Sequence, residues 1–352
     1  MIRKIALTAL VAMASLLGPA ATKSASADPA PGPFVIKLGT VAPKVSSWGK
    51  VFESWRRTVK KDTHGACELD WAYSGAAGDE EGMIVGMKSK ALHGAALTAT
   101  GLSMIYPSVV ALQMPGLVTT WAQLDAVRNT AKGTFDAAFE SASPGYKIFG
   151  WGDVGVGHVM YRKGEGKPDV RTPADLKAYH PFYIAGDAIG STFLATLGIQ
   201  SPKGLSVPAI LPAIAGRSSD SVDILTTPAI AAEQLQWAPH VTHVIDMPIG
   251  FGIGALIMDK DFFKSIPDAC KTVIADTGKA AAEVLTASIR GKDDEAWNEL
   301  KKTKTVVTLT EAEKAVWQQK FTELRQKLKA EGKINAATWD AVTAAAAAAK
   351  GR

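Results

Sequence analysis

Cysteine and histidine are scarce in this chain of 352 residues, and their scarcity argues against several kinds of chemistry. Neither of the two cysteines, Cys67 and Cys270, has a partner at a spacing typical of metal or redox sites. An exported protein could join them in a disulfide, which the sequence leaves open. His240 and His243 lie three residues apart, but no nearby cysteine or third histidine completes a zinc site. We therefore expect no metal and no cofactor.

Catalytic motifs are also missing. The sequence has no G-x-S-x-G elbow and no P-loop lysine pattern. The Gly-rich segment 150–157 does not open a helix, because strand-like residues follow it, and we interpret it as a turn near a strand end. The three carboxylates at 79–81 fit the start of a helix, where negative charge complements the helix dipole, better than an acid site. These absences predict that the protein is not an enzyme.

The charge distribution argues against a nucleic-acid partner. The formal net charge is +5, but the basic residues are spread along the chain and form no stripe interleaved with aromatic residues. Beyond the N-terminus no segment is long and apolar enough to cross a membrane.

The first residues have the layout of a secretory signal peptide. Arg3 and Lys4 precede an apolar run at 5–17, and a small-residue stretch then ends in the Ala25-Ser26-Ala27 cleavage pattern. The apolar run is shorter than the ~20 residues that span a bilayer, and no cysteine lies near the cut to carry a lipid anchor. We predict a cleaved signal peptide at 1–27 and a periplasmic mature protein.

The remaining chain exceeds the ~250–300 residues at which a single core usually stops growing, which predicts two domains. Its first part alternates expected strands and helices, typical of a parallel sheet with helices on both faces. In order these are strand 34–39, helix 48–61, strand 67–73, helix 80–92 and strand 95–98.

A second round of elements begins near residue 146. Strands are expected at 147–151, 158–162, 182–185 and 222–225, and helices at 191–197 and 210–214. A capping box at Thr172 to Asp175 starts another helical turn. A long helix at 271–302, a helix at 311–329 capped by Thr310 and an Ala-rich tail at 341–350 follow. The long helix exceeds what one domain needs, so we expect it to cross between domains.

This order predicts an α/β, two-lobed binding-protein fold with a hinge and a long lobe-spanning helix. We place lobe 1 at 28–155, lobe 2 at 156–250, and return strands and helices that pack on both lobes at 251–352. Such folds hold a ligand in the cleft at the carboxyl ends of their strands and close around it. Aromatic residues stand at expected strand ends and first helical turns, which favours an aromatic cleft: Trp48, Trp151, Phe182, Tyr183 and Trp237.

From about residue 34 to residue 328 the chain resembles the DctP-type substrate-binding subunits of tripartite ATP-independent periplasmic (TRAP) transporters. No single segment is specific, but their order and spacing are. The segments that carry the resemblance are 36–43 with Trp48, 87–100, 113–117, 172–177 and 222–228. The resemblance implies delivery of a small molecule to the integral-membrane subunits of a TRAP permease, with a further periplasmic or lipoprotein partner as an option.

The usual ligands of the family are organic acids, held by arginine, whose planar fork pairs bidentately with carboxylate. Here the alignment places Phe182 at the principal arginine position and Gly157 at the second. Thr226 and Thr227 replace the acidic residue and asparagine of a later family segment. Because a buried carboxylate without a cation is costly, we expect a neutral or apolar ligand.

The predicted ligand-binding residues are Trp48, Asp79, Thr100, Trp151, Gly157, Phe182, Tyr183 and Thr227. Three alternatives stay open. A carboxylate binder could use a relocated arginine, for which Arg162, Arg171 and Arg217 are candidates. A ligand-sensing protein could use the same scaffold without transport, and a neighbouring gene for a multi-span permease would distinguish the two. A secreted enzyme or lectin-like protein is the third, but no catalytic constellation supports it.

Overall fold

The computed structural model describes residues 32–349, so the predicted signal peptide at 1–27 lies outside the described residues. The strands are β1 Phe34–Thr40, β2 Cys67–Ala72, β3 Gly94–Thr98, β4 Tyr146–Tyr161, β5 Phe182–Ile184, β6 Lys203–Leu205, β7 Ile224–Pro228, β8 His243–Ile245, β9 Gly250–Asp259 and β10 Thr305–Val307. The α-helices are α1 Ser47–Asp62, α2 Glu80–Lys88, α3 Ala99–Ile105, α4 Trp121–Ser141, α5 Ala188–Thr196, α6 Val207–Ile214, α7 Ala229–Gln234, α8 Lys260–Ser265, α9 Asp268–Thr303, α10 Glu311–Ala330 and α11 Ala336–Ala348. Short 3₁₀ helices lie at Pro107–Gln113, Pro173–Ala178 and Ala238–His240.

The predicted α/β fold is confirmed, and one mixed sheet organises it. Its eight strands run in the order β10-β8-β4-β9-β3-β1-β2, with β7 paired to β4 off this path. Strands β1, β2 and β3 are parallel, as the strand-helix alternation predicts, whereas β9 joins β3 and β4 in antiparallel pairs. The small strands β5 and β6 form a separate parallel pair. The sheet is therefore continuous through β4 and β9, which link its two ends.

Helix α1 shows why periodic segments fold as expected. The apolar residues Trp48, Phe52, Trp55 and Val59 recur at helical spacing, and all four are buried against the sheet. The Ser46 side chain accepts a hydrogen bond from Gly49 N–H at 3.1 Å and caps the helix. The same logic places α10, where Thr310 and Glu313 form a capping box.

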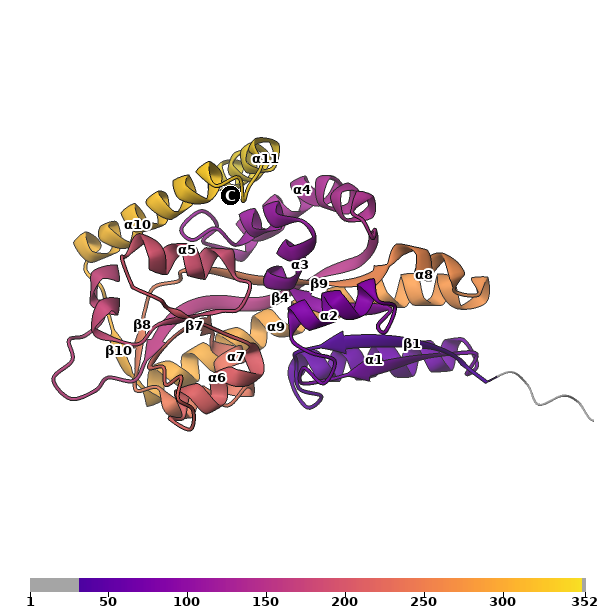
Figure 1. The fold of residues 1–352 in the computed structure, drawn as a ribbon, viewed down its shortest axis with the longest axis horizontal. Coiled ribbons are helices and arrows are strands. Elements are labelled where there is room, and N and C mark those ends of the chain that lie inside the picture. Colours follow the sequence, from indigo (N-terminus) through magenta and orange to yellow (C-terminus); the bar gives the residue numbers. More distant parts are fainter. Residues whose placement is uncertain (1–31, 350–352) are drawn as a thin grey trace, which may run out of the picture. The chain divides into compact units, whose positions relative to one another are not determined.

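The Gly-rich segment 150–157 is not a turn, which corrects the sequence prediction. It is the middle of β4, a single 16-residue strand that also absorbs the two strands expected on either side. A Cβ added at Gly150 would lie 2.5 Å from the Ala282 side chain, and one at Gly152 would lie 2.4 Å from Leu285. Both contacts belong to α9, so the glycines let this helix approach the strand closely. Figure 1 shows α9 and α4 on opposite sides of β4.

The long helix α9 runs along both parts of the sheet, as predicted. It packs against α1 and, further along, against β4 and α7. Near its start, Cys270 forms a disulfide with Cys67 of β2, with Cα atoms 6.2 Å apart, which settles the pairing that the sequence leaves open. Further along, the carboxylate of Asp293 accepts hydrogen bonds from Val156 N–H at 2.6 Å and Ile230 N–H at 3.0 Å. One helix therefore anchors β2, the bulged part of β4 and the start of α7.

Several other boundaries differ from the expectation. Helix α2 ends at Lys88 rather than 92, and α6 begins at Val207, ahead of the expected residue 210. Helix α4 and the strands β8, β9 and β10 have no counterpart in the sequence prediction. Within residues 32–349, no helix is both long and apolar enough to cross a bilayer.

Candidate ligand-binding pocket

A cavity of about 330 Å³ lies where several strands end. The last residues of β1, β3, β5 and β7 contribute to its wall, and the middle of β4 and the start of β9 pass beside it. Carboxyl ends of neighbouring parallel strands are the usual ligand position in open α/β folds. The pocket therefore occupies the place that the topology favours.

Most of the wall is apolar. Helix α1 contributes Trp48 and Phe52, and the loop after α7 contributes Trp237. The Trp48 indole N–H donates to the Asp153 carbonyl at 3.3 Å, which fixes the ring beside β4. Further apolar lining residues come from most of the surrounding elements, and those from β5, α5, β9 and α10 include Phe182, Ile184, Phe193, Ile253 and Phe321. A concave apolar wall with a few placed polar groups is typical of small-molecule sites.

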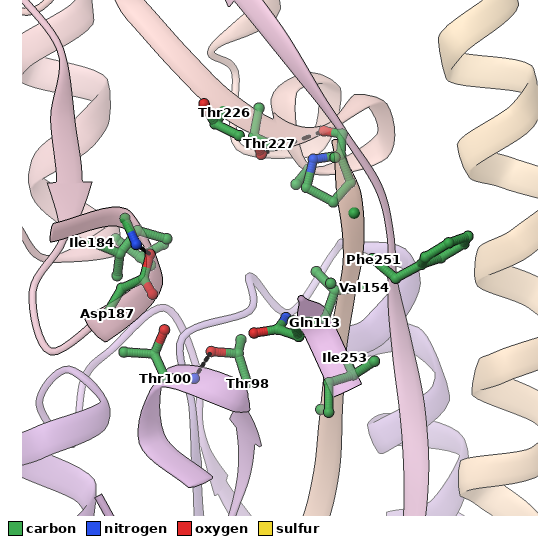
Figure 2. A pocket seen from close by; sticks show the side chains of 18 of the residues that line it. Thr98, Thr100, Gln113, Val154, Ile184, Asp187, Thr226, Thr227, Phe251 and Ile253 are labelled. Atoms are coloured by element: carbon green, nitrogen blue, oxygen red, sulfur yellow. Dashed lines mark hydrogen bonds between the residues drawn. The ribbon is translucent and has the colours of Figure 1, made fainter. Parts of the chain in front are cut away.

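The polar groups of the pocket are few and face one another across the cavity. Figure 2 shows Thr226 and Thr227 on one side, Thr98 and Thr100 on the opposite side, and Asp187 and Gln113 between them. The Thr98 hydroxyl is already engaged, because it donates to Glu80 at 2.8 Å and accepts from Thr100 N–H at 3.2 Å. These groups offer hydrogen bonds and, apart from one carboxylate, no charge.

Glu80 builds the floor of the pocket without lining it. Its carboxylate accepts from Thr98 N–H at 2.5 Å, from the Thr98 hydroxyl at 2.8 Å and from Gly101 N–H at 2.8 Å. Burial raises the pKa of Glu80, and these donors oppose that effect. The helix-start interpretation of 79–81 is thus correct for Asp79, which accepts from Gly82 N–H at 3.0 Å, whereas Glu80 turns inward to hold β3 and α3 together.

The charges on the pocket wall are all negative. Among the described residues that line the cavity there is no arginine, lysine or histidine. Two aspartates do line it. Asp153 is fully buried, and its carboxylate accepts from Arg128 at 2.8 Å and from Arg290 Nε at 2.7 Å, both outside the cavity. Its charge is therefore balanced within the protein.

Asp187 is the second acid and has a different environment. It caps α5, where Oδ1 accepts from Ile189 N–H at 2.9 Å and Oδ2 accepts from Gly190 N–H at 3.0 Å. Within residues 32–349 no lysine, arginine or histidine forms an ion pair with it. Burial among protein atoms raises the pKa of Asp187 to about 6. This carboxylate is the least compensated charge on the wall.

Six of the eight predicted site residues lie on the pocket wall, namely Trp48, Thr100, Gly157, Phe182, Tyr183 and Thr227. Trp151 does not, because alternate residues of a strand point to opposite faces and its ring packs on Phe135 of α4, with centroids 5.6 Å apart. Asp79 caps α2 and is also absent from the wall.

The candidate relocated arginines lie outside the lining as well. Arg162 donates to the Ile214 carbonyl at 2.6 Å, Arg171 pairs with Glu313, and Arg217 is exposed. Sequence reasoning missed Asp187, Thr98 and Gln113 as pocket residues. Asp187 had a usable signal, because it closely follows an expected strand and precedes an expected helix, where both caps and ligand contacts gather.

Solved structures with this fold carry several small acids. The chain matches a TRAP periplasmic solute-binding protein from Ralstonia eutropha with bound (S)-2-acetolactate at TM-score 0.77 and 21% identity, covering 90% of this chain and 99% of that one. A TRAP periplasmic solute-binding protein from Sulfurospirillum deleyianum with bound succinate matches at TM-score 0.78 and 17% identity, covering 89% and 99%. One from Desulfovibrio salexigens with bound orotic acid matches at TM-score 0.75 and 18% identity, covering 90% and 99%.

A search of curated proteins finds no match. The family model for DctP, described as bacterial extracellular solute-binding protein, family 7, matches residues 38–331. That match runs from within β1 to just past the end of α10 and includes nearly all of the pocket wall. The chain therefore belongs to family 7 of the bacterial extracellular solute-binding proteins, the DctP family.

Proposed function

We propose that this protein is exported by its signal peptide, binds a neutral or largely apolar small molecule in the periplasm and delivers it to the membrane subunits of a TRAP-type transporter. One observation carries the ligand class: the described lining of the pocket contains no cationic side chain. A carboxylate transferred into such a wall would lose its hydration without gaining a paired cation.

The aromatic and aliphatic wall supports the same ligand class. Phe182 stands where the family resemblance places the principal arginine, and with Trp48 and Phe52 it gives the ligand apolar contact surface. Burial of apolar surface contributes about 25 cal/mol per Å², so an apolar body can supply the binding energy that an ion pair supplies elsewhere.

Transport requires closure and release, for which we propose the two lobes at 28–155 and 156–250. Their boundary falls within β4 beside Gly155, whose φ of +131° favours glycine. Closure on ligand would present the surface that the permease recognises, and a further periplasmic or lipoprotein partner fits the same scheme.

The test is to identify what the protein carries. The mature protein is purified under native conditions, denatured and extracted, and the extract is analysed by mass spectrometry. We expect a neutral or apolar molecule at near-stoichiometric yield. A dicarboxylate or keto acid at that yield would contradict the proposed ligand class and favour a carboxylate binder.

A further inference from the structure

The Asp187 carboxylate is an acceptor without a complete set of donors. It receives two backbone N–H groups, one on each oxygen, at 2.9 and 3.0 Å. An ionised carboxylate offers about four acceptor positions, so each oxygen keeps one. Asp187 is part of the cavity lining, and Figure 2 shows it beside Thr100, at the edge of the same open space. The remaining positions are thus open to a group in the cavity.

Two buried structural carboxylates, Asp153 and Glu80, have stronger or more numerous donors than Asp187, which is only partly buried. Asp153 has two guanidinium partners, at 2.8 and 2.7 Å. Glu80 has three donors from one turn, at 2.5, 2.8 and 2.8 Å. Asp187 has no guanidinium partner and only two backbone donors. It is the one carboxylate of the three without a side-chain donor among the described residues. Asp187 is partly exposed on the pocket wall, so a donor on a bound ligand can reach its spare acceptor positions.

The negative charge of the Asp187 carboxylate determines which chemical group of a ligand can bind beside it. A carboxylate head near Asp187 would face a like charge in a low-dielectric pocket, and neither group could be paired by the described lining. A hydroxyl or a protonated amine would instead donate to Asp187, and hydrogen bonds to charged groups are the stronger ones.

On the basis of the proposed apolar-pocket function, we propose that Asp187 is the specificity-determining residue of the pocket. It accepts a hydrogen bond from an O–H or N–H donor on the head of the ligand and excludes a carboxylate at that position. Thr100, which lies beside Asp187 in Figure 2, is placed to contact the same head. The polarity of recognition is therefore the reverse of an arginine clamp.

The test uses three probes with the same straight eight-carbon chain and different heads: octylamine, octan-1-ol and octanoate. Their binding to the mature protein, freed of co-purified ligand, is measured by calorimetry and by the fluorescence of Trp48 and Trp237, which line the pocket. We expect the amine and the alcohol to bind, and octanoate to bind at least about tenfold more weakly than the amine, because the amine donates a charge-assisted hydrogen bond to Asp187 whereas the acid meets a like charge.

The variant Asp187→Asn removes the charge and keeps the shape, and its amide oxygen can still cap one of the two N–H groups that Asp187 accepts. It should reduce the preference for amine over acid by about tenfold or more. Asp79→Asn is the matched control, since it makes the same change at the cap of α2 outside the pocket. Equal binding of octanoate and octylamine to the unmodified protein, or equal effects of the two variants, would overturn the role of Asp187 and leave the apolar pocket standing. Failure of all three probes to bind would instead reject the apolar pocket, and the inference with it.

Discussion

The surroundings of Asp153 and Asp187 differ although both residues line one pocket. Asp153 sits where α4, β4 and α9 meet, and Arg128 and Arg290 converge on it while Asp125 pairs with Arg290 in turn. Asp187 sits in the turn between β5 and α5 and meets only backbone N–H groups. Two guanidinium groups thus balance the carboxylate that joins α4, β4 and α9, whereas the carboxylate on the wall between β5 and α5 has no cation partner among residues 32–349.

The strongest challenge to this contrast is Asp153→Asn. Arg128 and Arg290 would keep their charges but lose the buried carboxylate between them, so we expect a loss of about 3–5 kcal/mol in the free energy of unfolding. Denaturant unfolding measures it. Asp125→Asn is the control, because Asp125 is partly exposed and should matter less. A loss no larger than that of Asp187→Asn would remove the distinction between the two sites.

A second variant lowers stability without touching pocket charge. Cys67→Ala with Cys270→Ala removes a disulfide that joins residues 203 apart, which should lower the unfolding free energy by about 2–5 kcal/mol. Alanine is chosen because both cysteines are buried and a serine hydroxyl there would need a partner. Affinity for the octyl probes should stay unchanged, since neither cysteine lines the pocket. Lost affinity in a still-folded variant would show that the pocket depends on this anchor.

Asp293→Asn sharpens the comparison. Asp293 is buried and has no cation partner among residues 32–349, but it lies outside the cavity lining. Its two oxygens accept from Val156 and Ile230 N–H separately, and an amide can satisfy only one of them. The orphaned N–H should lower the unfolding free energy by about 1–3 kcal/mol. Asp187 also accepts two N–H groups on separate oxygens, so Asp187→Asn should show a similar loss, and binding of the octyl probes, which Asp293→Asn should leave unchanged, separates the two residues.

The smallest expected effect concerns pH. Burial raises the pKa of Asp187 from the ordinary 3.8 to about 6, so between these values the folded state binds a proton that the unfolded state does not. This residue therefore adds stability as the pH falls from 7 towards 4, and the ionised form detracts from it above 6. The N–H group that the amide cannot accept adds a pH-independent loss, but the stability of Asp187→Asn relative to the unmodified protein should rise as the pH goes from 4 to 7, by on the order of 1 kcal/mol or more.

Thermal midpoints of the two proteins across this range measure the difference. A constant difference from pH 7 to pH 4 would show that Asp187 does not titrate in the window. The ligand-free protein must be used, because a bound donor head stabilises the ionised carboxylate and shifts the window downward.

Sequence patterns predict those parts of the fold whose causes are local. The apolar face of α1 and the capping pair Thr310 and Glu313 are visible within a few residues, and both are present. The continuity of β4 is not visible, because Gly150 and Gly152 look like turn residues until α9 is packed on them. A glycine that makes room for a distant helix is indistinguishable in sequence from one that bends the chain.

The pocket was predictable for residues at strand ends and first helical turns, such as Trp48, Phe182 and Thr227. Trp151 does not line the pocket, because it lies within strand β4, not at its end, and its ring points towards α4. Gln113 was not predicted as a pocket residue, because it ends a 3₁₀ helix whose sequence has no helical periodicity of apolar residues. The importance of Asp187 depends on which charges are missing around it, and that is a property of the assembled wall.

The Cys67–Cys270 bond also has a consequence for how the protein is made. If the chain is exported from its amino end, as proposed, Cys67 reaches the oxidising compartment about two hundred residues before Cys270. During that interval β1, α1 and β2 can assemble while the Cys67 thiol has no correct partner, and with only two cysteines in the chain there is no wrong one within it either. On that proposal the disulfide forms late in export, and its presence shows that the chain has entered the oxidising compartment at least as far as the start of α9.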